Sequence, residues 1–303
     1  MPHRTPASGP SHFPSDGSRH LRTPFPAIAT DPETAAALLP QVTLLDTRDE
    51  AAFARGHLPG SGRMTIEEFG ERRAELPPRT AHVLVVHDEP EQARAGAEAV
   101  GALGYPHTRW LSSPLAVLAA AAGSALDTGP AVRLWRPSPF LERVLPRLPH
   151  GRSLDLAAGT SRESVFLAMH GREAEAWDHD DDALESARKL ARRNGVGIRT
   201  HVIELESGAM PDAGGGWDIV MVFRFLHRPL FPWIESAVAP GGVLVYETFL
   251  TGQERFGSPK QKRFLLESGE LRRAFPALAV EEYEEGAPDL FPVMARLFAR
   301  RPI

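Results

Sequence analysis

Apolar and polar positions follow two different periods along the chain, and the change between them predicts alternating strands and helices. Short apolar runs predict buried strands, whereas stretches with apolar residues every three or four positions predict amphipathic helices. This alternation is typical of a parallel sheet covered on both faces. In the N-terminal part the predicted elements are, in chain order, a helix from Thr30 or Asp31 to Leu39, a strand over Val42–Leu45, helices over Glu50–Arg55 and Ile66–Leu76, a strand over His82–Val86, a helix over Pro90–Leu103 and a strand over His107–Leu111.

A second α/β series begins near residue 150. From Ser153 to Asp178 the sequence predicts a strand ending in Asp155, a loop of small residues, an amphipathic helix and a second strand ending in Asp178. The elements predicted after it are a helix over Asp181–Asn194, strands over His201–Ile203, Trp217–Phe223 and Gly242–Thr248, a helix over Glu267–Ala274, and strands over Leu278–Tyr283 and Leu290–Ala299.

The length of 303 residues fits two domains. Residues 1–26, rich in Pro, Ser and Gly, are expected to form a disordered tail rather than a signal peptide. The first domain is assigned to residues 27–112. An Ala-rich linker follows at 113–130, with a short helix over Leu115–Ala122, and the second domain covers 131–303.

Composition narrows the function classes. The net charge of −5 argues against a general affinity for nucleic acid, and no apolar run approaches the length of a membrane span. A cytoplasmic protein is therefore expected. The sequence has no cysteine, which excludes disulfides, thiolate metal sites and a cysteine nucleophile. We expect no metal site.

The unit from Ser153 to Asp178 indicates a site for a nucleotide-like ligand, because loop amides and a strand-end acid meet there. A nicotinamide dehydrogenase would need a G-x-G-x-x-G loop, of which only Gly159 is present. Two simpler interpretations remain open. Asp155 could serve only as a charge at a helix N-terminus, and Asp178 could belong to the solvated acidic run that caps the next helix.

The order of segments resembles the class I S-adenosylmethionine-dependent methyltransferases, and within them the small-molecule subgroup of tellurite-resistance methyltransferases. The segments are LDLAAGTSRESVFLA, AWDHDDDALESARKLARRNG, VIELESGAMP, WDIVMVFRFLHRPLF and VAPGGVLVYETF. The resemblance implies an α/β fold with a Rossmann-like sheet whose last strand is antiparallel. It also implies S-adenosylmethionine as cofactor and a small-molecule acceptor.

The same resemblance suggests which residues bind the methyl donor. Asp155 would order the loop and the amino end of the donor, and Asp178 would bind both ribose hydroxyls. Glu204 would face the adenine, with the backbone amide of Leu205 nearby. The loop positions where this family prefers glycine are occupied here by Ala157, Gly159 and Ser161.

Candidates for chemistry follow the fourth strand, where this fold places acceptor contacts. His227 is a candidate base, and Arg224 or Arg228 could hold an anionic acceptor. The alternative is that His227 and Arg228 only solvate the turn before Pro229. The long polar segment after the fifth strand predicts a mobile lid carrying Arg255, Lys260, Lys262 and Arg263.

The first domain resembles the rhodanese family through LLDTRDEAAFARGHLPGS, which includes Asp46, Arg48 and Phe53. In that family a catalytic cysteine follows the fourth strand and accepts sulfur as a persulfide. His87 stands at that position here, and the loop carries Asp88, Glu89 and Glu91. An imidazole cannot form a persulfide, and the acids would repel an anionic sulfur donor. We therefore expect no sulfurtransferase activity, and a role in partner docking, dimerisation or stabilisation.

Two alternatives to a small-molecule methyltransferase remain open. The chain could be a catalytically weak or inactive regulatory protein that still binds S-adenosylmethionine, as the missing cysteine and the glycine-poor loop allow. An RNA methyltransferase would need a basic face with aromatic residues. The net acidity argues against it.

Overall fold

The structure is a computed structural model that describes residues 25–208, 210–211 and 216–303. Its described residues form two compact units, 25–136 and 137–303. The disordered tail predicted for residues 1–26 lies outside the described residues, apart from Phe25 and Pro26. Within the described ranges no helix combines the length and the apolar character needed to cross a bilayer.

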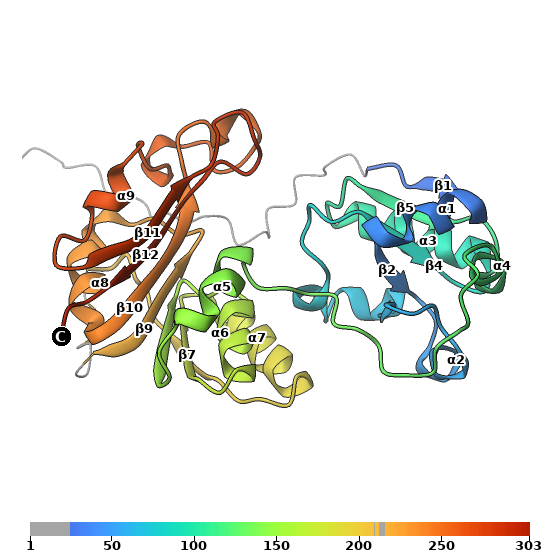
Figure 1. Ribbon diagram of the computed structural model, residues 1–303, viewed down its shortest axis with the longest axis horizontal. Coiled ribbons are helices and arrows are strands. Elements are labelled where there is room, and N and C mark those ends of the chain that lie inside the picture. The colour runs from blue at the N-terminus through green and yellow to red at the C-terminus, as the bar shows by residue number, and fades with distance from the viewer. Residues whose placement is uncertain (1–24, 209, 212–215) are drawn as a thin grey trace, which may run out of the picture. The chain divides into compact units, whose positions relative to one another are not determined.

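The first unit contains a parallel sheet of five strands in the order β1-β5-β4-β2-β3 (Figure 1). This confirms the predicted parallel sheet. The sequence prediction missed the short strands β1 and β3 because each is too brief to show a period. The strands are β1 Ile28–Thr30, β2 Thr43–Asp46, β3 Gly62–Arg63, β4 Val83–Val86 and β5 Thr108–Leu111.

Helices cover both faces of this sheet. Alternate residues of β2 and β4 point to opposite faces, so that Leu44 and Leu84 pack with α1 and α4, whereas Leu45 and Val85 pack with α3. The helices are α1 Pro32–Leu38, α2 Glu50–Arg55, α3 Pro90–Ala102 and α4 Leu115–Ala121. Short 3-10 turns occur at Leu39–Gln41, Ile66–Phe69 and Arg73–Glu75.

The helix predicted over Ile66–Leu76 is wrong. Two separate 3-10 turns replace it, with Gly70 between them. Thr65 and Glu68 form a capping box at the start of the first turn. Glycine destabilises a helix interior and two prolines follow the segment, which explains why the turn does not propagate.

The segment expected to be a linker, residues 113–130, packs onto the first unit in the structure. Leu115 and Leu118 of α4 lie in its core. The backbone of Asp127 pairs with that of His57, with N–O distances of 2.8 and 2.9 Å, and Val132 donates its amide to Ser61 at 3.0 Å. The chain therefore passes from the first unit to the second near residue 136.

The second unit contains a sheet of seven strands in the order β11-β12-β10-β9-β6-β7-β8. β12 runs antiparallel to both of its neighbours and the other pairs are parallel, which confirms the predicted sheet with an antiparallel last strand. The strands are β6 Arg152–Leu156, β7 Glu173–Asp178, β8 Arg199–Val202, β9 Trp217–Phe223, β10 Val238–Phe249, β11 Ala279–Glu285 and β12 Met294–Arg300.

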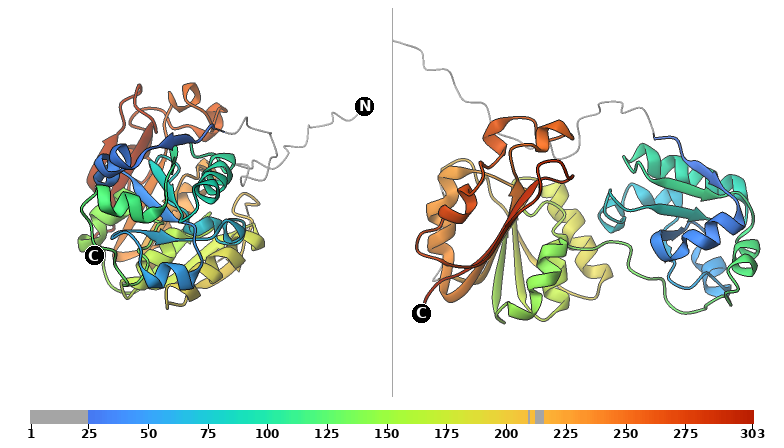
Figure 2. Two further views of the ribbon diagram at one scale, coloured as in Figure 1. Left: turned by 90° about the vertical axis from the view of Figure 1, so that its right-hand side faces the viewer. Right: turned by 45° about the horizontal axis from the view of Figure 1, so that its top comes forward.

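Helices α6 and α7 lie on one face of this sheet, and α8 and α9 on the other (Figures 1 and 2). The core on the α8 face is apolar and includes Leu154, Val220, Tyr246, Ile234 and Leu271. The sequence prediction missed α5 and α8, which are short. The helices are α5 Pro139–Val144, α6 Arg162–Met169, α7 Asp181–Arg193, α8 Phe231–Ala237 and α9 Glu270–Arg273, with 3-10 turns at Leu145–Arg147, Arg228–Leu230, Gln253–Arg255 and Lys262–Phe264.

The central strand β6 marks the point where the strand order reverses. From β6 the chain adds β7 and β8 on one side, and β9, β10, β12 and β11 on the other. Ligands of open α/β sheets bind outside the carboxyl ends of the strands at such a point. The carboxyl ends of β6 and β9 are therefore the place to look for a site.

The backbone at this edge adopts left-handed conformations. Ala157, Gly159 and Ser161, after β6, have φ angles of 54°, 53° and 50°, and Arg224, after β9, has φ 56°. Among the described residues, Ala157, Ser161 and Arg224 are the non-glycine residues with positive φ. All three lie at the carboxyl edge of β6 and β9. Backbone strain of this kind concentrates at functional sites.

The backbone of the loop predicts the effect of Gly159→Ala. A Cβ atom at Gly159 would meet no atom within 4 Å, so the substitution adds left-handed strain without a clash. We expect the free energy of unfolding to fall by about 1 kcal/mol. Urea titration followed by tryptophan fluorescence measures the change. Gly197→Ala is the matched control, because its Cβ also meets open space and its φ is not positive. Equal effects of the two substitutions would contradict the prediction.

Candidate functional site at the carboxyl ends of β6 and β9

Asp155 is a buried carboxylate at the end of β6. It is 2% exposed, and the hydroxyl of Ser164 donates to its Oδ2 at 2.9 Å. Burial and the neighbouring charge of Glu163 raise the pKa of Asp155 well above its usual range, and Arg224 partly opposes this. An acid in this state favours a cationic group beside it, because such a group would stabilise the ionised form.

Asp178 fixes the loop after β6. Its Oδ2 accepts the amide of Gly159 at 2.7 Å, and its Oδ1 accepts the amide of Asp180 at 2.9 Å. The ring Nδ1 of His179 lies 3.2 Å from the same Oδ1. Asp178 is therefore bound to the loop and is not a solvated member of the acidic run. Each carboxylate oxygen keeps a lone pair for a ligand hydroxyl.

The hydroxyl of Ser161 is buried, and its Oγ has no hydrogen-bond partner among the described residues. A buried hydroxyl without a partner costs about 1–3 kcal/mol, which a polar ligand group would offset. The open space at Gly159 lies two residues earlier in the same loop. The loop thus offers both room and an unused polar group.

Glu204 and Leu205 follow β8, the strand next to β7. The loop is tied to the site because Ile203 donates its amide to the carbonyl of Asp178 at 2.8 Å. The side chain of Leu205 is buried in the core, whereas Glu204 is exposed and accepts the amide of Glu206 at 3.2 Å. Their roles toward an adenine stay predictions.

The three candidates for chemistry after β9 differ in their surroundings. Arg224 is exposed, and its guanidinium makes no hydrogen bond or ion pair within the described ranges. His227 is half-buried, and no hydrogen bond to its ring occurs in that part of the chain. Both remain free for a ligand, and their catalytic roles stay predictions.

The guanidinium of Arg228, in contrast, already makes hydrogen bonds within the protein. Its guanidinium pairs with Glu270 through Nε at 2.5 Å and Nη2 at 2.9 Å, and it donates to the carbonyls of Arg263 and Leu265, both at 2.9 Å. Arg228 therefore fastens the segment after β10 and α9 to the strand end. These contacts would have to be exchanged for Arg228 to bind an acceptor, and that predicted contact stays a prediction.

The segment predicted to be a mobile lid is held at several points. Thr251 donates its amide to the carbonyl of Leu266 at 2.9 Å, and the amide of Val293 donates to the side chain of Gln253 at 2.9 Å. Arg255 also donates to the carbonyl of Pro288. In Figure 1 this orange segment lies beside the carboxyl end of the sheet, and its mobility stays a prediction.

Sequence reasoning missed a group of residues linked to Glu163, an acid whose charge acts on Asp155. Ser138, which caps α5, donates its amide to Glu163 at 3.2 Å and its hydroxyl to Glu247 at 3.0 Å. Glu247 in turn pairs with Arg296 of β12. The Ser-Pro pair that starts α5 is a helix N-terminus signal, but nothing in the sequence indicates what Ser138 contacts.

The corresponding loop of the first unit follows β4. The ring Nδ1 of His87 accepts a hydrogen bond from the amide of Glu89 at 3.0 Å, so the imidazole is bound to the backbone of its own loop. Asp88 pairs with Arg48 at 3.1 Å. Arg48 is buried and binds Asp46 at 2.7 Å and the carbonyl of Gly56 at 2.8 Å. The Arg48 network is therefore part of the core structure of this unit.

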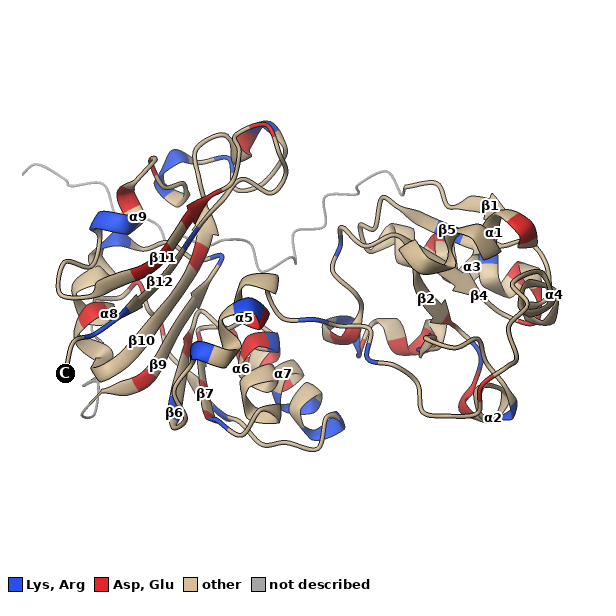
Figure 3. Ribbon diagram, viewed as in Figure 1, with Lys and Arg blue, Asp and Glu red and all other residues tan. Residues whose placement is uncertain are grey.

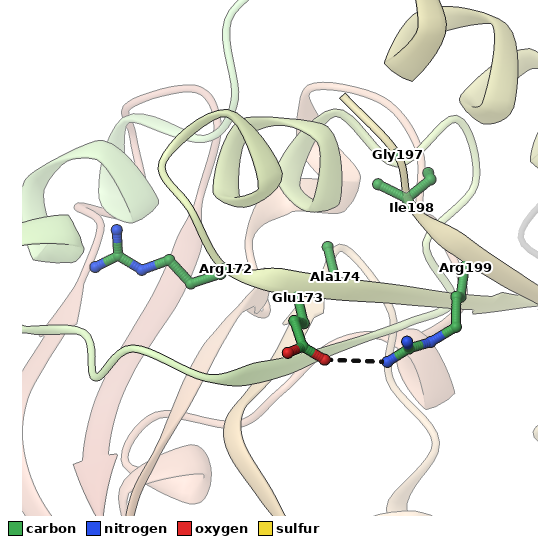
Figure 4. Close-up of a pocket in the computed structure, with 6 residues that line it drawn as sticks. All are labelled: Arg172, Glu173, Ala174, Gly197, Ile198 and Arg199. Carbon is green, nitrogen blue, oxygen red and sulfur yellow. Dashed lines mark ion pairs between the residues drawn. The ribbon is translucent and has the colours of Figure 1, made fainter. Parts of the chain in front are cut away.

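Other parts of the described structure give weaker evidence for a functional site. A shallow pocket lies at the opposite edge of the second sheet, where β7 and β8 begin, and Arg199 there already pairs with Glu173 at 3.7 Å (Figure 4). Its lining residues are Arg172, Glu173, Ala174, Gly197, Ile198 and Arg199. No cluster of three or more metal-ligating side chains occurs among the residues that the structure describes.

Comparisons with known proteins agree with this geometry. The family model described as "Tellurite resistance protein TehB" matches residues 143–295, and the model described as "Rhodanese-like domain" matches residues 31–113. The two family resemblances seen in the sequence are thereby confirmed.

Curated relatives match over shorter stretches. Hemagglutinin 1 of Eikenella corrodens is 24% identical over 140 residues, which cover 44% of this chain and 46% of that protein. The probable S-adenosyl-L-methionine-dependent methyltransferase TehB of Haemophilus influenzae is 25% identical over 84 residues, covering 27% of this chain and 28% of that protein. The chain thus spans less than half the length of these relatives.

Two solved structures illustrate the similarity. TehB from Haemophilus influenzae aligns with a TM-score of 0.47 at 16% identity, covering 55% of this chain and 62% of that chain. A magnesium protoporphyrin IX methyltransferase from Synechocystis PCC 6803 with bound SAM aligns with a TM-score of 0.43 at 14% identity, covering 53% and 76%. Because the TehB model spans residues 143–295 of 303, the chain belongs to the TehB family of S-adenosylmethionine-dependent methyltransferases and carries a rhodanese-like domain before that region.

Proposed function

We propose that the second unit binds S-adenosylmethionine at the carboxyl edge of β6 and transfers its methyl group to a small-molecule acceptor. The observation that carries the proposal is the loop after β6, which combines left-handed backbone, open space at Gly159 and a buried hydroxyl without a partner at Ser161. Family membership supports the same donor. The bound cofactor would supply an already activated methyl group.

The charges at this edge suit a cationic ligand. Asp155 and Glu163 are both buried, and their mutual repulsion contributes to the raised pKa of Asp155. A sulfonium or ammonium group nearby would stabilise both carboxylates. Asp178 would accept the ribose hydroxyls through the free lone pairs of its two oxygens. Glu204 and the amide of Leu205 would complete the adenine side.

The protein's remaining task is alignment of the acceptor. In-line transfer needs the acceptor atom held close to the methyl group, and a base where the acceptor carries a proton. His227 is the proposed base, and the exposed guanidinium of Arg224 would hold an anionic group of the acceptor. Arg228 is left out of this set because Glu270 and two carbonyls occupy it.

We propose further that the rhodanese-like unit has no sulfurtransferase activity. The chain lacks a cysteine, and the loop after β4 is closed by the bond between His87 and Glu89 and by the pair of Asp88 with Arg48. A surface for a protein partner is the role proposed for it. The second candidate function, a regulatory protein that binds the donor without transferring methyl, draws support from the strained Ala157 and Ser161.

Calorimetric titration with S-adenosylhomocysteine tests donor binding. We expect the wild-type protein to bind, and Asp178→Asn to weaken binding at least tenfold, about 1.4 kcal/mol, because one oxygen loses its acceptor capacity. Asp182→Asn, in the exposed part of the same acidic run, is the control and should bind as the wild type. Absence of wild-type binding at millimolar ligand would remove the proposal. A screen of cell extract with labelled donor then separates methyl transfer from the regulatory alternative.

Asp155→Asn should make the protein more stable but bind the donor less well. The folded protein holds the Asp155 proton at pH values where the unfolded chain, with a pKa near 3.8, has lost it. The stability from this protonated form is complete below that pH and is lost as pH rises toward the raised pKa. Asparagine does not ionise, so we expect a gain on the order of 1 kcal/mol at pH 8 and little change near pH 3.5. Urea unfolding at both pH values measures this, and a gain equal at both would speak against the assignment.

The absence of sulfurtransferase activity is tested with thiosulfate and cyanide, by colorimetric detection of thiocyanate. We expect no product from the wild type. We also expect none from His87→Cys alone, because Asp88 and Glu89 keep the loop negative and a sulfur donor is an anion. Thiocyanate formed by the wild-type protein would contradict the proposal.

A further inference from the structure

One arginine of β12 stands at the centre of a row of charges that crosses three strands. Arg296 lies directly opposite Glu247 on β10 and opposite Glu284 on β11. Its Nε pairs with Oε2 of Glu247 and its Nη1 lies 2.9 Å from Oε1 of Glu284. Opposite charges on facing positions stabilise neighbouring strands. Figure 3 shows acidic and basic segments along these neighbouring strands of the sheet.

Both ends of the segment around α5 are attached to this row. At the N-terminal end, Ser138 donates its hydroxyl to the second oxygen of Glu247 at 3.0 Å. At the other end, Arg143 lies 3.0 Å from the same Glu284 oxygen that Arg296 binds. The contacts form a closed ring that runs from Ser138 through α5 to Arg143, Glu284, Arg296 and Glu247, and back to Ser138.

Two paired carboxylates, those of Glu247 and Glu284, stabilise this ring. Glu247 is 8% exposed at its side chain, and a buried carboxylate is held firmly only when it is paired. Burial raises the pKa of Glu284, but the hydrogen bonds from Arg143 and Arg296 outweigh it and hold the pKa below its ordinary value. The guanidinium fork suits this task because it presents several donors in a fixed geometry.

The same segment reaches the donor site. The amide of Ser138 donates to Glu163 at 3.2 Å, and Glu163 is the acid whose charge acts on buried Asp155. Ser138 is itself 9% exposed. We propose that Arg296 is a positioning residue of the donor site, which holds the Pro137–Val144 segment through Glu247 and Ser138 so that Glu163 stays beside Asp155. This inference rests on the proposed function, and Arg296 contacts neither the donor nor the acceptor in it.

The test uses the full chain and two readouts. Hydrogen–deuterium exchange reports whether peptides over 137–144 stay protected, and calorimetry reports the affinity for S-adenosylhomocysteine. We expect Arg296→Met to raise exchange of this segment at least tenfold and to weaken binding at least tenfold. Arg300→Met is the matched control on the same strand, because Arg300 pairs with Glu281, donates to the carbonyls of Gly241 and Arg147, and contacts no member of the ring. It should leave both readouts within twofold of the wild type.

Ser138→Ala gives a second route, because it breaks the ring while Glu247 keeps its pair with Arg296. It also removes the hydroxyl that accepts the amide of Phe140 at the start of α5, so affinity is the deciding readout of this variant. We expect the same direction of change in both readouts, and a raised KM for S-adenosylmethionine with kcat little changed once an acceptor is known. Unchanged exchange or unchanged affinity in Ser138→Ala would overturn the inference. A wild-type protein that binds no S-adenosylhomocysteine would instead show that the proposed function fails, and the positioning role would fall with it.

Discussion

The second unit depends on how a buried carboxylate is accommodated at the end of its central strand. Asp155 is almost fully buried, and the nearest acid, Glu163, makes its ionisation harder still. The fold keeps both acids in place through Ser164, through Ser138 and through the charge of Arg224. Stability alone would favour an apolar residue here. In the proposed function a cationic ligand group completes the arrangement, as the sulfonium and ammonium groups of a methyl donor would.

The strained backbone at the same edge is explained in the same way. Ala157 and Ser161 occupy left-handed positions where glycine would be less costly, and Arg224 does the same at the end of the neighbouring strand. The strained conformation of the loop is stabilised by the carboxylate of Asp178, which accepts a hydrogen bond from the backbone amide of Gly159. Rigid support around a strained loop is how a preorganised binding site is built.

The two units use similar architecture with different outcomes. In the rhodanese-like unit the loop after β4 is filled by contacts of its own side chains, with Asp88 paired to Arg48 and His87 bound to a neighbouring amide. In the second unit the loop after β6 leaves open space and an unused hydroxyl. The contrast is the reason for proposing small-molecule chemistry in the second unit rather than in the first.

The sequence by itself determined the alternation of strands and helices, both family resemblances and the acids at the ends of β6 and β7, because these features are local in the chain. It also showed that the 303 residues include no cysteine. Short elements such as β1, β3 and α5 were beyond it, since a few residues carry no period. Only the tertiary structure decided that Arg228 is occupied, that residues 113–130 pack onto the first unit and that Arg296 faces Glu247 and Glu284. These facts depend on strand register and on contacts between residues far apart in sequence, which hydrophobic patterning does not encode.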